Sequence, residues 1–409
     1  MTTAQQADVI IVGGGIFGCA IAYYYTRNNP GRKVLVLERN EICNAATSRA
    51  AALLTRIRSK QHFIPLSLET YAAIAAMEKQ LQESLDIKQT GVLHIAASEN
   101  SVNDLKQLMQ IAAEFGDTAE YIDNNTAKQK LPWLQTDEVL ATGFMPTESY
   151  CDPYLLGTFF ARCAKMQGAN IRQGVAVTGL IQQQNIVTGV STSAGNFYAD
   201  AVVIATGTWS PLLGKQVGVG LPLAPVRSQY WITERHNLFP VTQPIALLPD
   251  AQAYARPEGG SLLFGIREPQ SLVVSPDKIP DDISNYSFSA DGGMADLAAV
   301  MHQLAKFFPG IYDIGLKHYI AGFSGYTPDN NLSIGKVPGV EQLFAAAGCV
   351  GAGISTAGGV GLALAELVAG KQSPFDISAF NLERFGVIDP FSDEWLQQCA
   401  LARSQKRSG

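Results

Sequence analysis

The first forty residues alternate between short apolar runs and a glycine-rich turn. Asp8-Val-Ile-Ile-Val12 runs into Gly13-Gly-Gly-Ile-Phe-Gly18, and Val34-Leu-Val-Leu37 is a second apolar run that ends at Glu38. Continuous apolar runs bounded by turn residues are typical of buried parallel strands. Residues 15–28 between them favour a helix, which Asn28-Asn29-Pro30-Gly31 would end. The pattern therefore predicts a strand, a tight turn, a helix and a second strand.

Later patterns predict more elements of the same kind. Apolar residues at helical spacing indicate a helix over about Ile64–Leu85, and Asp152-Pro153 is a start signal for a helix that ends near Gly168. Strands are expected at Val175–Leu180, Val187–Thr192 and Ala201–Ala205, the last as a buried parallel strand.

The pattern of apolar and polar residues changes from Val226 onward. Residues 226–234 carry no buried-strand run, and the apolar segments 252–257 and 261–265 flank Glu258-Gly-Gly260, which is a hairpin signal. Residues 270–293 are polar and contain two prolines, which favours a surface loop or lid. These features predict an α/β fold with a Rossmann-like domain and a second domain built on an antiparallel sheet. The predicted boundaries are 1–90, 145–222 and 320–372 for the first domain, 91–144 and 223–319 for the second, and 373–409 for a C-terminal tail.

Composition and charge narrow the function classes. The chain has 409 residues and a formal net charge of −6, which argues against a nucleic-acid binder. The six cysteines and five histidines are dispersed without metal-ligand spacing, so no metal is expected. No stretch is long enough to span a bilayer and no basic leader precedes the first strand, so we expect a cytoplasmic protein without a transmembrane segment. The basic tail Arg403-Ser-Gln-Lys-Arg407 is expected to be solvated, with peripheral contact to an anionic membrane as the alternative.

The glycine turn has the spacing of a dinucleotide site. Gly13 permits the tight turn, Gly15 lets the backbone approach a pyrophosphate, and Gly18 lets the helix pack close to the strand. The helix N-terminus offers N–H groups to phosphates. Glu38 stands where an acid accepts hydrogen bonds from ribose hydroxyls. A glycine-rich turn without a ligand is the alternative, but it does not account for Glu38.

Five segments together resemble the FAD-dependent D-amino acid oxidase superfamily, which contains glycine oxidase, sarcosine oxidase and related amine dehydrogenases. They are residues 13–38, Thr47-Ser48-Arg49, residues 205–210, Thr327-Pro-Asp329 with Ile334-Gly335, and the glycine-rich run 348–361. The resemblance covers nearly the whole chain. Residues 322–329 are most similar to the sarcosine oxidase β-subunit and L-proline dehydrogenase branch.

The resemblance implies FAD in an extended pose. Glu38 would hold the ADP ribose, the backbone of Val177 would meet the adenine, and residues 351–355 would place N–H groups near the flavin N1–C2=O edge. For the late glycines, close helix packing is the alternative. Sarcosine oxidases attach flavin through a cysteine where this chain has Gly322, so we expect non-covalent FAD, with Cys349 as the nearest thiol. The implied FAD-binding residues are Gly13, Gly15, Ile16, Phe17, Gly18, Glu38, Arg39, Thr47, Ser48, Arg49, Ala51, Ala52, Leu53, Val177, Thr206, Gly207, Trp209, Gly322, Gly351, Ala352, Gly353, Ile354 and Ser355.

The implied chemistry is removal of hydride from a C–H beside an amine nitrogen of a small amine or amino acid. The resemblance predicts substrate-carboxylate cations at positions that are here Ser324, Gly351 and Ser355, so all three are missing. Either another base replaces them or the substrate is not a simple amino acid. The candidate cations are Arg56, Arg58, Arg256 and Arg267. The alternative for each of them is a structural position at the surface or at the domain interface. Tyr230, Tyr254 and Tyr326 are candidate pocket residues or else core aromatics. We take Tyr254, Tyr326, Arg58 and Arg267 as the candidate catalytic set.

The electron acceptor and the substrate class stay open at this point. Sarcosine-type oxidases hold an oxygen-activating lysine on the strand that matches residues 261–265, and Leu263 stands at that position here. The resemblance therefore implies a dehydrogenase that passes electrons to a quinone, a carrier protein or a partner subunit. Two alternatives are an FAD-dependent 2-hydroxy acid dehydrogenase and a non-catalytic flavoprotein assembly factor.

Overall fold

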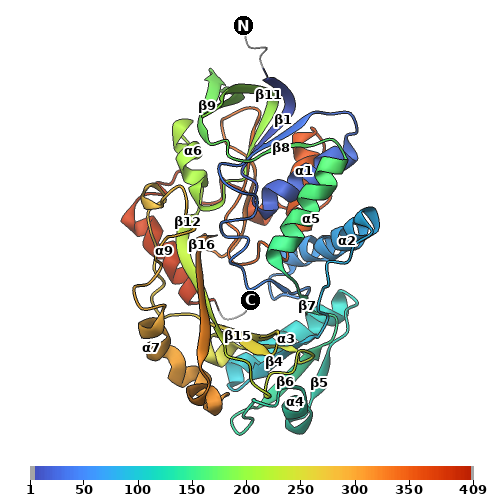
Figure 1. The fold of residues 1–409 in the computed structure, drawn as a ribbon, viewed down its shortest axis with the longest axis vertical. Coiled ribbons are helices and arrows are strands. Elements are labelled where there is room, and N and C mark those ends of the chain that lie inside the picture. The colour runs from blue at the N-terminus through green and yellow to red at the C-terminus, as the bar shows by residue number, and fades with distance from the viewer. Residues whose placement is uncertain (1–4, 407–409) are drawn as a thin grey trace.

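The structure, a computed structural model, describes residues 5–406 and contains two large sheets, one toward each end of an elongated molecule (Figure 1). The first sheet has the order β17-β18-β11-β1-β2-β8, with β9 and β10 attached beside β11. Its strands are β1 (Gln5–Val12), β2 (Val34–Leu37), β8 (Asn170–Arg172), β9 (Val177–Gln183), β10 (Ile186–Thr192), β11 (Gly195–Ile204), β17 (Ser333–Lys336) and β18 (Leu343–Ala347). Strands β18, β11, β1, β2 and β8 run parallel, as the continuous apolar runs predict.

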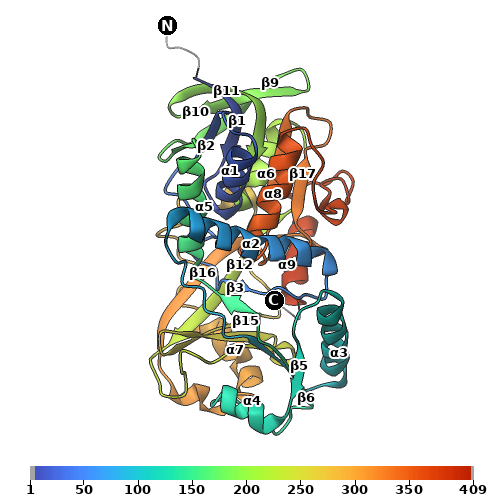
Figure 2. The same cartoon turned by 90° about the vertical axis from the view of Figure 1, so that its right-hand side faces the viewer.

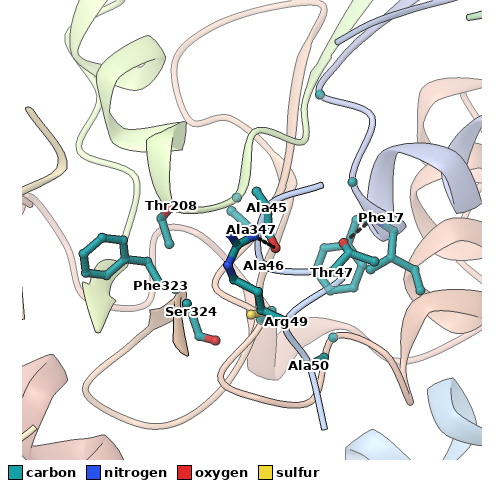
Figure 3. A pocket seen from close by; sticks show the side chains of 18 of the residues that line it. Phe17, Ala45, Ala46, Thr47, Arg49, Ala50, Thr208, Phe323, Ser324 and Ala347 are labelled. Atoms are coloured by element: carbon teal, nitrogen blue, oxygen red, sulfur yellow. Dashed lines mark hydrogen bonds between the residues drawn. The ribbon is translucent and has the colours of Figure 1, made fainter. Parts of the chain in front are cut away.

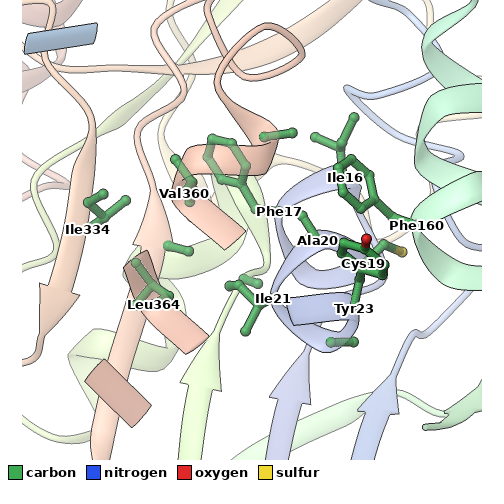
Figure 4. Close-up of a cluster of buried hydrophobic side chains, with 14 of the residues drawn as sticks. Ile16, Phe17, Cys19, Ala20, Ile21, Tyr23, Phe160, Ile334, Val360 and Leu364 are labelled. Carbon is green, nitrogen blue, oxygen red and sulfur yellow. The ribbon is translucent and has the colours of Figure 1, made fainter. Parts of the chain in front are cut away.

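Helices α1 (Ile16–Asn28), α5 (Pro153–Met166) and α8 (Ala357–Val368) cover one face of this sheet, and α2 (Ile64–Leu81) lies across them (Figures 1 and 2). Helix α1 is buried between α5 and α8, with Phe17 and Ile21 facing Val360 and Leu364 (Figure 4). Helix α6 (Ser210–Gln216) packs on the other face. The first helix is confirmed, whereas α2 ends four residues before the predicted Leu85.

Three late glycines allow α8 to pack closely on its neighbours. A Cβ built on Gly361 would lie 2.8 Å from Ala20 of α1, and Cβ atoms on Gly358 and Gly359 would lie within 2.6 Å of the α2 backbone at Thr70 and Leu66. Helix packing therefore explains the second half of the glycine-rich run.

The second sheet has the order β16-β12-β15-β14-β13-β4-β6-β5 and is antiparallel except for the β13–β4 pair. Its strands are β4 (Val92–Ala96), β5 (Glu120–Ile122), β6 (Ala141–Met145), β12 (Ala224–Thr233), β13 (Ile245–Leu248), β14 (Ala253–Glu258), β15 (Ser261–Ile266) and β16 (Leu316–Tyr326). The helices of this half are α3 (Glu99–Glu114), α4 (Asn124–Lys130) and α7 (Met294–Ala305), and β3 (Leu53–Leu54) pairs with β7 (Ser149–Tyr150) between the two sheets. The predicted fold class is confirmed.

One prediction for this region needs correction. Residues 226–234 were expected to lack a buried strand, but β12 is buried along most of its length because β16 and β15 flank it and α9 (Asp393–Ser404) packs on it. The predicted boundaries 144/145 and 319/320 fall inside β6 and β16. Both strands continue without a break across these positions.

Two local signals are confirmed. The β14–β15 hairpin turns at Gly259 and Gly260, whose φ values of +57° and +88° favour glycine. Asp152 caps α5, where its Oδ1 accepts the Leu155 N–H at 2.9 Å and Pro153 fills the first turn.

The C-terminal segment was predicted to be solvated, and this is wrong for its described part. Helix α9 packs against β12 and β16, and Arg403 is only 4% exposed because it pairs with Glu268 at 2.6 Å. Arg407 lies outside the described residues. Within residues 5–406 no helix is long and apolar enough to cross a membrane.

Candidate functional site

One long cavity runs along the carboxyl ends of the first sheet's parallel strands and reaches the second sheet. Its walls come from segments that are far apart in the sequence: 12–17, 37–58, 205–216, 228–230, 322–326 and 346–355. Figure 3 shows Phe17 and Thr47 on one side, Arg49 in the middle, and Thr208, Phe323 and Ser324 on the opposite side. Ligands of open α/β sheets bind at this edge.

The glycine turn leaves a helix N-terminus open to this cavity. Gly13 has a φ of +106°, and a Cβ on it would lie 2.5 Å from Ala205 O. A Cβ on Gly18 would lie 2.0 Å from Gly13 O, so only glycine lets α1 start this close to β1. A Cβ built on Gly15 would meet only Thr47 Oγ1, at 3.6 Å. This hydroxyl oxygen accepts the Ile16 N–H at 3.1 Å. The opening is suited to a phosphate.

Glu38 is oriented by backbone donors at the end of β2. Its Oε2 accepts the Gly14 N–H at 2.8 Å, and its Oε1 accepts the Asn40 N–H at 2.9 Å. Each carboxylate oxygen keeps a lone pair for a further donor on the cavity side. Next to it, the Arg39 guanidinium lies 4.2 Å from the centre of the Trp209 ring, and burial lowers the pKa of Arg39.

Arg49 connects the segment after β2 with the loop 270–293. Its Nη1 donates to Asn44 O at 2.8 Å and its Nη2 to Ile283 O at 3.3 Å, so it fixes residues 281–283 at the cavity. A Cβ on Gly322 would lie 3.0 Å from Arg49 Cδ, so glycine leaves room for the arginine stem. The predicted loop 270–293 therefore contributes to the cavity wall.

The first half of the late glycine run forms a strained loop at the cavity. Val350 has a φ of +44° and Gly351 a φ of +72°, and the Val350 N–H donates to Gly325 O at 2.8 Å. Left-handed backbone is unusual for a β-branched residue and often marks a functional loop. The loop then leads through Ser355 into the N-terminus of α8.

The four predicted catalytic residues all line the cavity. Arg58 donates to Ser355 Oγ at 2.7 Å, and burial lowers the pKa of Arg58 to about 10. Tyr254 lies across Gly265 of the neighbouring strand, where a Cβ would lie 2.5 Å from its ring. Burial lowers the pKa of Arg267 and raises that of Tyr254, and the two side chains interact electrostatically with Tyr326.

The other two candidate arginines lie elsewhere. Arg56 pairs with Asp117 at 2.7 Å, and Arg256 donates to Ala51 O at 2.7 Å and lies against the Tyr150 ring. Tyr230, by contrast, lines the cavity, and burial raises its pKa to about 12. Leu263 is buried within the second sheet.

Most of the predicted FAD-binding residues line the cavity, and three do not. Gly18 is a packing position, the Ser48 hydroxyl donates to Asn44 O within its own turn, and Ala352 O accepts the hydroxyls of Ser355 and Thr356. Sequence reasoning missed Lys406 and Arg403, which line the cavity from the end of the chain. Their local pattern resembles any charged terminus, so no sequence signal identified them.

The cavity fits the chemistry of FAD. One end offers the α1 N-terminus and Glu38, and a long wall of glycine and alanine lies along it. Thr208 Oγ1 and Trp209 Nε1 are buried in that wall without a hydrogen-bond partner among the described residues. Buried polar atoms are rarely left unpartnered, so these two are available to a bound polar group. Residues 5–406 contain no cluster of three His, Cys, Asp or Glu side chains that could hold a metal.

The fold and this site define a dinucleotide-dependent α/β oxidoreductase. Residues 8–367 match the family model described as FAD dependent oxidoreductase, and the chain belongs to this family. FAD is therefore its cofactor.

The names of several similar proteins refer to small amines or amino acids. The chain is 27% identical over 376 residues to "4-methylaminobutanoate oxidase (formaldehyde-forming)" of Paenarthrobacter nicotinovorans, covering 92% of this chain and 45% of that protein. It is 26% identical to "Glycine oxidase" of Geobacillus kaustophilus, covering 93% and 97%. The structure of L-proline dehydrogenase from P. horikoshii superposes with a TM-score of 0.81 at 25% identity, covering 93% and 98%. The chain spans about half the length of several curated relatives that it matches, which include mitochondrial sarcosine and dimethylglycine dehydrogenases.

Proposed function

We propose that this chain removes hydride from a C–H beside an amine nitrogen of an amino acid or secondary amine. One observation carries the proposal: Tyr254, Tyr326 and Arg267 interact electrostatically with one another in the cavity that Arg58, Glu38 and the glycine turn also line. The family membership and the names of the similar proteins support it.

Separate groups of cavity residues would bind the cofactor and the substrate. Glu38, Thr47 and the α1 N-terminus would hold the ADP part of FAD, and residues 351–355 would lie beside the flavin. Bound FAD supplies the hydride acceptor. Arg58 and Arg267 would bind and orient an anionic group of the substrate, and the rings of Tyr254 and Tyr326 would exclude water from the amine. Gly322 offers no thiol, which supports non-covalent FAD.

We also propose that the chain is a dehydrogenase. Leu263 is apolar and buried where the resemblance implies an oxygen-activating lysine, and this supports a quinone or a carrier protein as the electron acceptor. The six cysteines are unpaired, which supports the reducing environment of the cytoplasm.

Anaerobic bleaching of the flavin absorbance tests the substrate class. The holoprotein is mixed with sarcosine, L-proline, D-amino acids, simple amines and 2-hydroxy acids. We expect one class of amine or amino acid to bleach the flavin. Arg267→Met should slow bleaching by a carboxylate-bearing amine at least about tenfold, which is about 1.4 kcal/mol. Arg162→Met is the matched control, because Arg162 pairs with Glu83 at the surface and outside the cavity, and it should change the rate less than about twofold.

Three other outcomes have distinct meanings. Bleaching by 2-hydroxy acids alone would favour the hydroxy acid dehydrogenase. No bleaching by any compound, with FAD bound, would contradict an amine oxidoreductase and favour a non-catalytic flavoprotein. Rapid peroxide formation with a good substrate would contradict the dehydrogenase.

A further inference from the structure

Lys406, which follows helix α9, points its ammonium group into the wall of the cavity. Its Nζ donates to Val350 O at 2.9 Å, at the strained loop before α8. An ammonium group has three N–H donors, and Val350 O uses one of them. The end of the described chain thus brings a cation to the same end of the cavity as Tyr326.

Buried contacts fix the position of this segment. Arg403 Nη1 donates to Glu268 at 2.6 Å and to Ser271 Oγ at 2.7 Å, and Asn330 Nδ2 donates to Ala402 O at 2.8 Å. Arg403 and Ser404 are each 4% exposed. Lys406 lies two residues beyond these anchors, so its placement follows from the packing of α9.

Lys406 and Tyr326 border the space that a side chain at position 351 would enter. A Cβ built on Gly351 would lie 3.7 Å from Lys406 Nζ and 2.8 Å from Tyr326 Oη. The resemblance to glycine oxidase-like proteins implies a carboxylate-binding arginine at position 351, where this chain has glycine. The ammonium group of Lys406 therefore brings a positive charge next to position 351 from a different element of the fold.

The surroundings of Lys406 favour an anion. Burial and the positive charges of Arg267, Arg58 and Lys60 lower the pKa of Lys406. A partly buried cation among other cations is costly, and an anion beside it removes part of that cost. A substrate carboxylate matches both the sign of the charge and the remaining ammonium donors.

We propose that Lys406 binds the carboxylate of the substrate and thereby selects amino acids over simple amines. This inference rests on the proposed function, because it names the substrate class of the same site. Lys406 replaces the cation that Gly351 lacks, and the C-terminal helix is the element that delivers it.

Paired ligands test the inference. L-proline and pyrrolidine, and sarcosine and dimethylamine, differ in each case only by the carboxylate. In the Lys406→Met holoprotein, the KM or Kd for the carboxylate-bearing member should rise about tenfold or more, and that for the simple amine should change little. Lys406→Arg should restore part of the preference. Lys371→Met is the matched control, because Lys371 is half exposed and pairs with Glu366 at 3.3 Å.

A second measurement does not depend on turnover. Acetate is titrated into the oxidised holoprotein, and its Kd is read from the change in the visible flavin spectrum, with chloride at equal ionic strength as reference. Lys406→Met should raise the acetate Kd about tenfold or more without loss of bound FAD. If acetate binds the wild type and Lys406→Met alike, or does not bind the wild type, the inference is overturned. If no amine bleaches the flavin but acetate binding still depends on Lys406, the proposed function fails and the carboxylate site remains.

Discussion

At the scale of single residues, the glycine turn makes a sharp prediction about FAD affinity. Gly18→Ala adds a Cβ that would lie 2.0 Å from Gly13 O, so α1 must shift away from β1 and move its N-terminal N–H groups. We expect FAD affinity to fall at least about tenfold, or about 1.4 kcal/mol. The flavin-to-protein absorbance ratio after dialysis and an FAD titration measure this. Gly310→Ala is the control, because its Cβ would meet only Phe308 Cε2 at 3.5 Å. Equal FAD affinity in both variants would contradict this account of Gly18.

Glu148 makes stability depend on pH. Burial raises its pKa to about 7, although its oxygens accept the Arg56 and Ile57 N–H groups at 2.6 and 3.1 Å. The pKa is higher in the folded chain, so the stability that Glu148 contributes is fully present below about pH 4.5 and is lost as the pH rises through about 7. The loss is at most about 3 kcal/mol.

Comparison with Glu148→Gln isolates this effect, because glutamine does not titrate. We expect the free energy of unfolding of the wild type, minus that of Glu148→Gln, to decrease between pH 5 and pH 8. Urea unfolding at several pH values measures the difference. A difference that stays constant across this range would show that Glu148 has an ordinary pKa.

At the scale of elements, the position of α9 depends on a buried ion network. Glu268 accepts from Arg403 at 2.6 Å and from Arg227 at 3.3 Å, and all three side chains are less than a tenth exposed. Glu268→Gln leaves the buried Arg403 with a neutral partner, which should cost about 3 kcal/mol, whereas Arg227 keeps its ion pair with Asp296 at 2.6 Å. The expected results are a lower Tm and faster tryptic cleavage after Arg403. Asp86→Asn, which breaks the exposed Lys88–Asp86 pair, should cost less than about 1 kcal/mol.

The same helix shows where prediction from sequence ends. The β1–α1–β2 unit and the Gly259–Gly260 hairpin follow from local rules, because strand runs, turn glycines and cap residues act over a few positions. Arg403 is buried because of Glu268, which is 135 residues away in the sequence. A charged terminus has no local signal for such a partner. Arg56 and Arg58 show the same limit, since only the fold places Arg56 at Asp117 and Arg58 at Ser355.

At the scale of the whole molecule, the cavity joins segments from both sheets and from α9, so bound FAD should stabilise the entire fold. At an FAD concentration 100 times its Kd, the expected gain is about 2.7 kcal/mol, or a rise in Tm of a few degrees. Thermal unfolding of apoprotein with and without added FAD measures the gain. At the same FAD concentration, the at least tenfold weaker affinity expected for Gly18→Ala reduces the gain to about 1.4 kcal/mol or less, because the substitution disturbs the turn at the ADP end. Lys406→Met should keep it in full, because Lys406 contacts Val350 at the far end. If Lys406→Met lost the gain as Gly18→Ala does, Lys406 would belong to the cofactor site, since a residue that contacts substrate alone leaves cofactor affinity unchanged.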